Sequence, residues 1–175
     1  MIYKKSWKYI LIRDDSYWCN CYCNIYHIKA VKDFSDISFG DIGGYLEGYY
    51  NLSQKGSCWI YNSAIVSNFA RVTENARLYN YAKAREYAEV FGDARIYGNA
   101  RVTDNAKVSG NARINGNVEV YGNAVVTENA RVSENAGVHG NAKVLGNANV
   151  SGNADVYGNI VVNDDIQEIL EIYTN

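Results

Sequence analysis

His139 is the side chain best suited to acid–base chemistry in this sequence. Histidine titrates near neutral pH, and the chain has only one other, His27, which is expected to pack in the N-terminal part or to face solvent. Tyr121 and Tyr157 lie eighteen residues before and after His139. A general base between aromatic rings at a subunit interface would suit a transfer reaction. We favour the alternative, in which Ser, Thr, Tyr and His interchange at an exposed position, and we expect no catalytic residue.

Four cysteines form the second group with chemical potential: Cys19, Cys21, Cys23 and Cys58. The first three alternate, so on a strand their thiols would share one face, and with the fourth they could bind zinc. The C-x-C-x-C spacing nevertheless differs from the C-x₂₋₄-C spacing typical of zinc sites. Buried free cysteine also behaves as a small apolar residue. We therefore expect neither a metal nor a cofactor.

A row of arginines at intervals of eighteen residues is the most distinctive charged pattern. It consists of Arg77, Arg95, Arg113 and Arg131, and Trp59 holds the preceding position. Two residues further on come Tyr61, Tyr79 and Tyr97, followed by Asn115 and Ser133. Stacked arginines beside aromatic rings are suited to binding phosphates, a nucleotide or an acidic protein surface.

The alternative is that these arginines are solvated and balanced by neighbouring carboxylates, such as those of Glu74, Asp93, Glu128 and Glu134. Exposed ion pairs are common and contribute little. Like charges about 4.8 Å apart on neighbouring strands repel one another, however, and this favours a bound partner. Both interpretations stay open, and the four arginines with the three tyrosines are the candidate binding residues.

Outward apolar side chains on another face indicate self-association as a dimer or trimer. They are Phe91, Val125, Leu145 and Val161, with Lys107 and Lys143 among them. Clustered exposed apolar residues are typical of interfaces between copies of a chain.

The elements that must position these side chains follow from a six-residue repeat that runs from Ile60 to Val162 without insertion or deletion. Its consensus is V-x-G-N-A-x, so the aliphatic residue and the alanine are two apart and point to one side of an extended segment. A helix would need a 3.6-residue period and would be penalised by the glycine and asparagine content. The period predicts an all-β parallel β-helix.

Gly-Asn pairs such as Gly98-Asn99 mark the corners of each coil. Glu74 and Asp104 replace the glycine, so we expect the first corner residue to need no special backbone angle. Asparagine tolerates the left-handed conformation and is expected to supply the corner. Three corners close a triangular coil of eighteen residues, and about six coils stacked 4.8 Å apart make a rod about 28 Å long.

The chain divides into an aromatic-rich β cap (1–56), the β-helix (57–162) and a C-terminal cap (163–175). In the first part, residues 6–13 and 17–30 indicate strands around a turn at 13–16, and residues 40–44 a glycine-rich turn. This part is expected to cover the first coil. In the last part, Asp164 or Asp165 as N-cap, followed by spaced apolar residues, predicts a short amphipathic helix, with a final strand as the alternative.

Charge and hydropathy limit the binding partners and the cellular location that we expect. A net charge of −2 gives no basis for bulk attraction to nucleic acid or to a membrane, and direct nucleic-acid binding is not expected. No apolar window is long enough to span a membrane, and the stretch 9–12 is too short for a signal peptide. We expect a cytoplasmic protein with reduced cysteines. The end of the chain is acidic, because residues 132–175 have one basic and six acidic residues.

The repeat resembles that of the hexapeptide-repeat proteins, which form left-handed parallel β-helices and are typically trimers. Many are acyltransferases with a catalytic histidine and loops extruded from the coils, and this chain has no such loop. The stretches YHIKAVKDF (26–34), GDIGGYLE (40–47) and NLSQKGSCWI (51–60) are similar to the leader of a family of phage and prophage proteins with V-x-G-N-A-x repeats. This resemblance covers about residues 26–162 and implies a β-helix of phage origin.

The sequence thus predicts a non-enzymatic phage or prophage protein that interferes with a host protein, such as a defence nuclease, in an anti-CRISPR-like manner. Two alternatives stay open. One is an acyltransferase-like enzyme that acts through His139. The other is capture of a small phosphorylated ligand between subunits, near Arg85, Tyr121 and His139.

Overall fold

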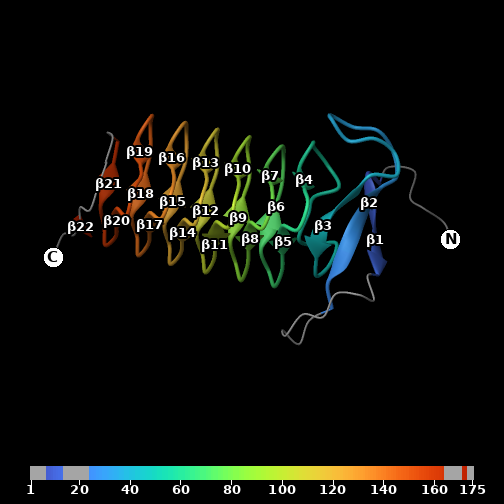
Figure 1. Cartoon of the computed structure of the whole chain (residues 1–175), viewed down its shortest axis with the longest axis horizontal. Coiled ribbons are helices and arrows are strands. Elements are labelled where there is room, and N and C mark those ends of the chain that lie inside the picture. The colour runs from blue at the N-terminus through green and yellow to red at the C-terminus, as the bar shows by residue number, and fades with distance from the viewer. Residues whose placement is uncertain (1–6, 14–23, 164–170, 173–175) are drawn as a thin grey trace.

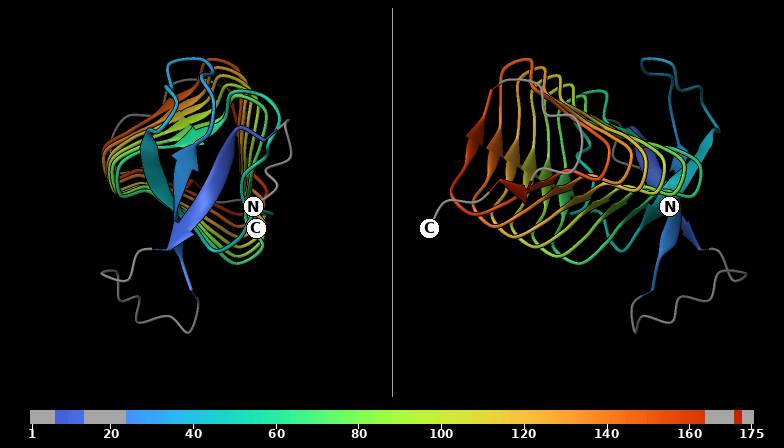
Figure 2. Two further views of the ribbon diagram at one scale, coloured as in Figure 1. Left: turned by 90° about the vertical axis from the view of Figure 1, so that its right-hand side faces the viewer. Right: turned by 60° about the vertical axis from the view of Figure 1, so that its left-hand side comes forward.

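The chain folds into a left-handed parallel β-helix of about seven turns, as the six-residue repeat and the hexapeptide resemblance together predict. A computed structural model describes residues 7–13 and 24–163, together with the backbone of residues 171 and 172. The coils follow one another along the rod, with the N-terminal strands at one end (Figure 1). Viewed along the rod, the coils superimpose (Figure 2). Within the described residues, no helix is long and apolar enough to cross a membrane.

Three sheets run along the rod, and each full coil adds one strand to each of them. The long sheet has the order β1 (Tyr9–Arg13), β2 (Tyr26–Ala30), β3 (Ile42–Leu46), β5 (Ile65–Val66), β8 (Lys83–Ala84), β11 (Arg101–Val102), β14 (Glu119–Val120), β17 (Gly137–Val138), β20 (Asp155–Val156), β22 (Glu171–Ile172). The arginine sheet consists of β4 (Trp59–Ile60), β7 (Arg77–Leu78), β10 (Arg95–Ile96), β13 (Arg113–Ile114), β16 (Arg131–Val132), β19 (Asn149–Val150). The third sheet consists of β6 (Arg71–Val72), β9 (Glu89–Val90), β12 (Lys107–Val108), β15 (Val125–Val126), β18 (Lys143–Val144), β21 (Val161–Val162).

The repeating alanine and aliphatic side chains fill the inside of the rod as one continuous core. Nearly all of them are fully buried, and Tyr9, Ile28 and Leu46 of the N-terminal strands belong to the same core. Backbone hydrogen bonds join each coil to the next, as where the Lys83 amide donates to the Ala100 carbonyl at 2.9 Å. Outward side chains therefore stand on a backbone that is fixed at every coil.

The first residue of each corner adopts the left-handed conformation, with φ of 59° at Glu74, 55° at Asp104 and 69° at Gly98. The asparagine that follows, such as Asn99, has no positive φ. The expectation that asparagine supplies the corner, and that the first position is unconstrained, is therefore wrong. Because a side chain is strained in this conformation, glycine is common at the first position.

Acidic residues are tolerated at these left-handed corners because their carboxylates bind the backbone of the next coil. Glu74 accepts a hydrogen bond from the Gly92 amide at 2.9 Å, and Glu128 accepts one from the Gly146 amide at 2.7 Å. Such charge-assisted bonds are stronger than neutral ones and offset the backbone strain.

Two substitutions at Glu128 separate strain from hydrogen bonding. Glu128→Gly should change the free energy of unfolding by less than about 1 kcal/mol, because relief of strain offsets the lost bond. Glu128→Val should lower it by about 2 kcal/mol, because a branched side chain keeps the strain and loses the bond. Denaturant unfolding of both variants measures the difference, and equal stabilities would contradict this account.

The corner asparagines form ladders of side-chain hydrogen bonds along the rod. At 2.9–3.3 Å, each side-chain amide donates to the side-chain oxygen of the asparagine one coil further on. The ladders are Asn99–Asn117–Asn135–Asn153, Asn105–Asn123–Asn141–Asn159 and Asn111–Asn129–Asn147. Asparagine thus tethers coil to coil and does not set the backbone angle.

The N-terminal strands differ from the expectation in their connection. β1 and β2 are antiparallel, and Arg13 lies opposite Tyr26. The described second strand therefore meets Arg13 at Tyr26, later than a hairpin closed at 13–16 would require, and residues 14–16 of the predicted turn are outside the described part. Residues 14–23, which include most of the predicted strand start, lie outside the described residues. Figure 2 shows β1 and β2 crossing the end of the coil stack.

Gly43 and Gly44 lie within β3 and not in a turn, which corrects the expectation for residues 40–44. β3 runs parallel to β5 and so begins the stacking of the rod. A Cβ atom on Gly43 would come within 2.5 Å of the Ile60 carbonyl oxygen, and one on Gly44 within 2.4 Å of the Ala64 oxygen. These glycines are needed for close approach of the backbones, and only Gly40, with φ of 94°, belongs to a turn.

At the other end, β22 (Glu171–Ile172) pairs in parallel with β20. A final strand, the alternative considered for the C-terminal cap, is what the structure has at these two residues. The remainder of the predicted helix, with Asp164 or Asp165 as its N-cap, lies outside the described residues.

Candidate binding face

The arginine row consists of Arg77, Arg95, Arg113 and Arg131, which lie directly opposite one another on neighbouring parallel strands. The last three are exposed, whereas the Arg77 side chain is only 17% exposed. Trp59 precedes Arg77 in the row but is buried, where it packs edge-on against Phe34 at 5.5 Å. The accessible part of the row is therefore Arg95, Arg113 and Arg131.

The tyrosine stack runs beside this row. The ring centroids of Tyr61 and Tyr79 are 4.4 Å apart, and those of Tyr79 and Tyr97 are 4.7 Å apart, with interplanar angles of 11° and 8°. The spacing follows the coil repeat, so the stack fixes the three rings parallel to one another. Their hydroxyl groups accordingly recur once per coil beside the guanidinium groups.

A loop from the N-terminal part contacts Arg77, the first arginine of the row. One carboxylate oxygen of Asp36 lies 2.9 Å from Nη1 of Arg77, and the other accepts a hydrogen bond from the Tyr61 hydroxyl at 2.8 Å. Nη2 of Arg77 also donates to the Ser35 hydroxyl at 2.6 Å. The connection between β2 and β3 thus closes one end of the row.

The contacts among Asp36, Tyr61 and Arg77 shift the pKa values of the carboxyl and hydroxyl groups. Burial alone would raise the pKa of Asp36, but the hydrogen bond from Tyr61 and the charge of Arg77 outweigh it and lower the pKa. Burial and the hydrogen bond to Asp36 raise the pKa of Tyr61. The carboxylate is therefore ionised at neutral pH and the hydroxyl is its donor.

The other three arginines have no ion pair with any carboxylate that the structure describes. Elsewhere on the rod, Arg101 pairs with Glu119 and Lys107 with Glu89, each at 3.0 Å. Of the carboxylates considered as balancing partners, Glu74 and Glu128 bind corner amides, and Asp93 accepts a hydrogen bond from Asn75 at 3.1 Å. Those three carboxylates thus have contacts at the corners and not with the row.

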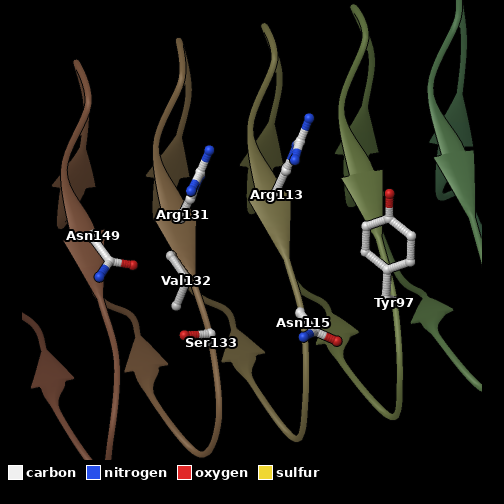
Figure 3. A pocket seen from close by; sticks show the side chains of 7 residues that line it. All are labelled: Tyr97, Arg113, Asn115, Arg131, Val132, Ser133 and Asn149. Carbon is white, nitrogen blue, oxygen red and sulfur yellow. The ribbon is translucent and has the colours of Figure 1, made fainter.

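An open depression of about 470 Å³ lies where the tyrosine stack ends. It is lined by Tyr97, Arg113, Asn115, Arg131, Val132, Ser133 and Asn149. Figure 3 shows the side chains of Arg113 and Arg131 side by side, with Tyr97, Asn115 and Ser133 on successive coils next to them. The smaller side chains that follow Tyr97 leave room for a ligand group beside the two guanidinium groups.

His139 directly follows β17 of the long sheet, and its ring is parallel to those of Tyr121 and Tyr157, with centroid distances of 4.5 and 5.1 Å. Its Nε2 atom is 3.0 Å from a carboxylate oxygen of Asp155. The imidazole is thus covered on both faces and paired at its edge. Arg85 stands in the same outward row two coils before Tyr121, and capture of a phosphorylated ligand between subunits at these residues stays a prediction.

Cys58 and His27 both have contacts within the N-terminal end of the rod. The Cys58 thiol is buried 3.1 Å from the ammonium group of Lys8, and burial raises the pKa of Cys58 and lowers that of Lys8. The other three cysteines lie outside the described residues, so the expectation of no metal and the zinc alternative are both untested. His27 lies 2.7 Å from the Gly43 carbonyl oxygen and stacks on Tyr45.

The candidate oligomer residues all belong to the face of the third sheet, which is a different face from the arginine sheet. Val161 is 53% exposed, whereas the other three are partly buried. Ser109 and Thr127 stand between Phe91 and Leu145 and share a hydrogen bond of 2.8 Å. The four apolar side chains are therefore interspersed with polar ones.

The sequence did not indicate Asp36 and Ser35 as part of the site. They lie in the leader, outside the repeat, and only the fold of the β2–β3 connection brings them to the arginine row. The six-residue period predicts contacts only between repeats, so it could not predict these two residues of the N-terminal part.

Comparison with known proteins supports the repeat architecture. A family model described as the YdcK beta solenoid repeat matches residues 94–108, a stretch that includes β10, β11 and β12. The search of curated proteins found no match.

Proposed function

We propose that this chain is a non-enzymatic binding protein of phage or prophage origin, and that its arginine row binds an acidic surface of a host protein. The main support is that Arg95, Arg113 and Arg131 stand in register without a carboxylate partner among the described residues. Three like charges spaced by about one coil repel one another, and an acidic partner would relieve this repulsion.

The rigidity of the rod favours such a role. The continuous core and the coil-to-coil hydrogen bonds hold the arginine row and the tyrosine stack in place before any partner arrives. A preorganised surface loses less conformational entropy on binding than a mobile one. Tyrosine and arginine are also the side chains that most often dominate the energy of protein interfaces.

The phage origin rests on the resemblance of the leader, and a host defence protein is the target that this origin suggests. The protein would then act in the host cytoplasm. Self-association as a dimer or trimer through the third sheet would leave the arginine sheet free for the partner, because the two sheets form different faces.

The proposal treats His139 as a structural residue, since both faces of its ring are covered by tyrosines. We expect calorimetry to detect no binding of coenzyme A or acetyl-coenzyme A. Acetyl-coenzyme A turnover by the wild-type protein that is lost in His139→Ala would contradict the proposal and favour the acyltransferase alternative.

The direct test is capture of the partner from host extract by the immobilised protein, followed by binding measurements with the purified partner. We expect the affinity to fall steeply as salt is raised, because exposed charges are screened. Affinity that is independent of salt would exclude the arginine row as the main contact. A captured partner with no acidic surface would do the same.

A further inference from the structure

The contact between Asp36 and the rod defines the geometry of one occupied anion site. Its two carboxylate oxygens are divided between Arg77, at 2.9 Å, and the hydroxyl of Tyr61, at 2.8 Å. Arg77 belongs to β7, whereas Tyr61 follows β4 on the preceding coil. The first site is thus a guanidinium group and a tyrosine hydroxyl from consecutive coils.

The same pair of groups recurs twice along the rod. Arg95 follows Arg77 in register, and Tyr79 stacks on Tyr61, which gives a second site. Arg113 and Tyr97 repeat the arrangement one coil further on and give a third site. Arg131 has Asn115 in the place of the tyrosine, and the asparagine amide can also donate a hydrogen bond.

The first site is filled by the chain itself, and neither the second nor the third has a carboxylate partner among the described residues. We propose that the second and third sites each take a carboxylate of an acidic protein segment in the way that Arg77 and Tyr61 take Asp36. This inference rests on the proposed function and specifies the chemistry of the partner.

The repeat of the sites also limits the spacing of the partner's carboxylates. Sites one coil apart are separated by about 4.8 Å, the spacing of neighbouring strands. Acidic residues three or four positions apart on a helix lie about 5–6 Å from one another and fit this spacing. Acidic residues at alternate positions of a single strand are about 6.6 Å apart and fit it less well. For a partner that binds through a single segment, the helix fits better than the strand, and we take an acidic helix face as the partner.

A synthetic helical peptide with glutamates three and four residues apart on one face is a suitable probe. A second peptide of the same composition, with the glutamates distributed around the helix, is its control. We expect the wild-type protein to bind the first peptide more tightly than the second, measured by calorimetry or by fluorescence anisotropy at low salt.

Asp36→Ala tests whether the first site is equivalent to the others. It removes the carboxylate from Arg77 and Tyr61 and leaves the hydrogen bond from Arg77 to Ser35 in place. The acidic peptide then gains a third site and should bind roughly two- to fivefold tighter, the range expected for an exposed ion pair. Asp36 is 53% exposed, so the substitution should leave the fold intact, and a thermal melt checks this. Glu89→Ala is the matched control, because it makes the same change in net charge and frees Lys107 on the third sheet.

The outcomes separate this inference from the proposed function. If the wild-type protein binds neither peptide, the acidic partner itself is wrong. If the peptide binds and Asp36→Ala gains no more than Glu89→Ala, the partner class stands and the equivalence of the sites is overturned. Tighter binding of a nucleotide such as ATP than of the acidic peptide would also overturn the inference, in favour of a phosphate ligand beside Tyr97.

Discussion

Gly44→Ala is expected to lower the free energy of unfolding by about 2–4 kcal/mol, because overpacking and a lost hydrogen bond act together. The added Cβ atom would come within 2.4 Å of the Ala64 carbonyl oxygen and 2.7 Å of Cγ2 of Ile60. The carbonyl of Ala64 is also the acceptor for the Tyr45 amide at 2.9 Å. The clash therefore falls on backbone that cannot move without breaking the contact between β3 and the rod.

Gly137→Ala is the matched control for this substitution. Gly137 also lies in a strand of the long sheet, but the nearest atom to its added Cβ would be a carboxylate oxygen of Asp155, at 2.6 Å. A side-chain end can rotate away, so the cost should stay below about 1 kcal/mol.

Urea unfolding should be followed by tryptophan fluorescence, because Trp7 and Trp59 lie at this end of the rod, and by circular dichroism, which reports on all the coils including that of Gly137. Rod proteins can unfold in parts, so the N-terminal transition has to be followed by itself. Equal midpoints for Gly44→Ala and Gly137→Ala would mean that β3 is not closely packed on the rod.

The repeat made most of the rod predictable, since a period of six residues leaves only one way to bury the alanine and the aliphatic side chains together. The same period placed Arg77, Arg95, Arg113 and Arg131 in one row, because eighteen residues close one coil. Side-chain columns follow from the period alone and need no information about contacts.

The corners were less predictable because each contains two residues. Amino-acid composition does not determine which of the two adopts the left-handed φ angle. Glu128, with φ of 62°, shows why: its strain is offset by a bond to Gly146 on the next coil. That bond depends on stacking, which sequence propensity does not include. Propensity for the left-handed conformation favoured the asparagine and gave the wrong position.

The N-terminal part has no period, so its contacts could not be derived. Gly43 and Gly44 have the composition of a turn, but the approach of the Ile60 and Ala64 carbonyl groups requires them in a strand. Asp36 likewise reaches Arg77 only through the path of the β2–β3 connection. Packing between residues far apart in the chain determines the strand position of the glycines and the contact of Asp36. The local sequence does not predict such packing.

Reversal of two charges in the arginine row should abolish binding of the acidic partner. The double substitution Arg95→Glu and Arg113→Glu replaces two attractions with two repulsions at the second and third sites. Like charges brought together at an interface cost several kcal/mol, so the affinity should fall by at least about a hundredfold. Both side chains are exposed and lack ion pairs within the described part of the chain, so the rod should fold unchanged.

A second double substitution, Arg71→Glu with Lys83→Glu, makes the same change in net charge on the other two sheets. It should reduce the affinity only slightly, through the long-range field, and this loss should vanish at high salt. The loss in the arginine row variant should be larger than that of the control at every salt concentration, because the variant removes direct contacts as well as long-range attraction. Similar losses in both double variants would mean that net charge, and not the arginine row, attracts the partner. Binding that survives Arg95→Glu with Arg113→Glu would place the contact on another face of the rod.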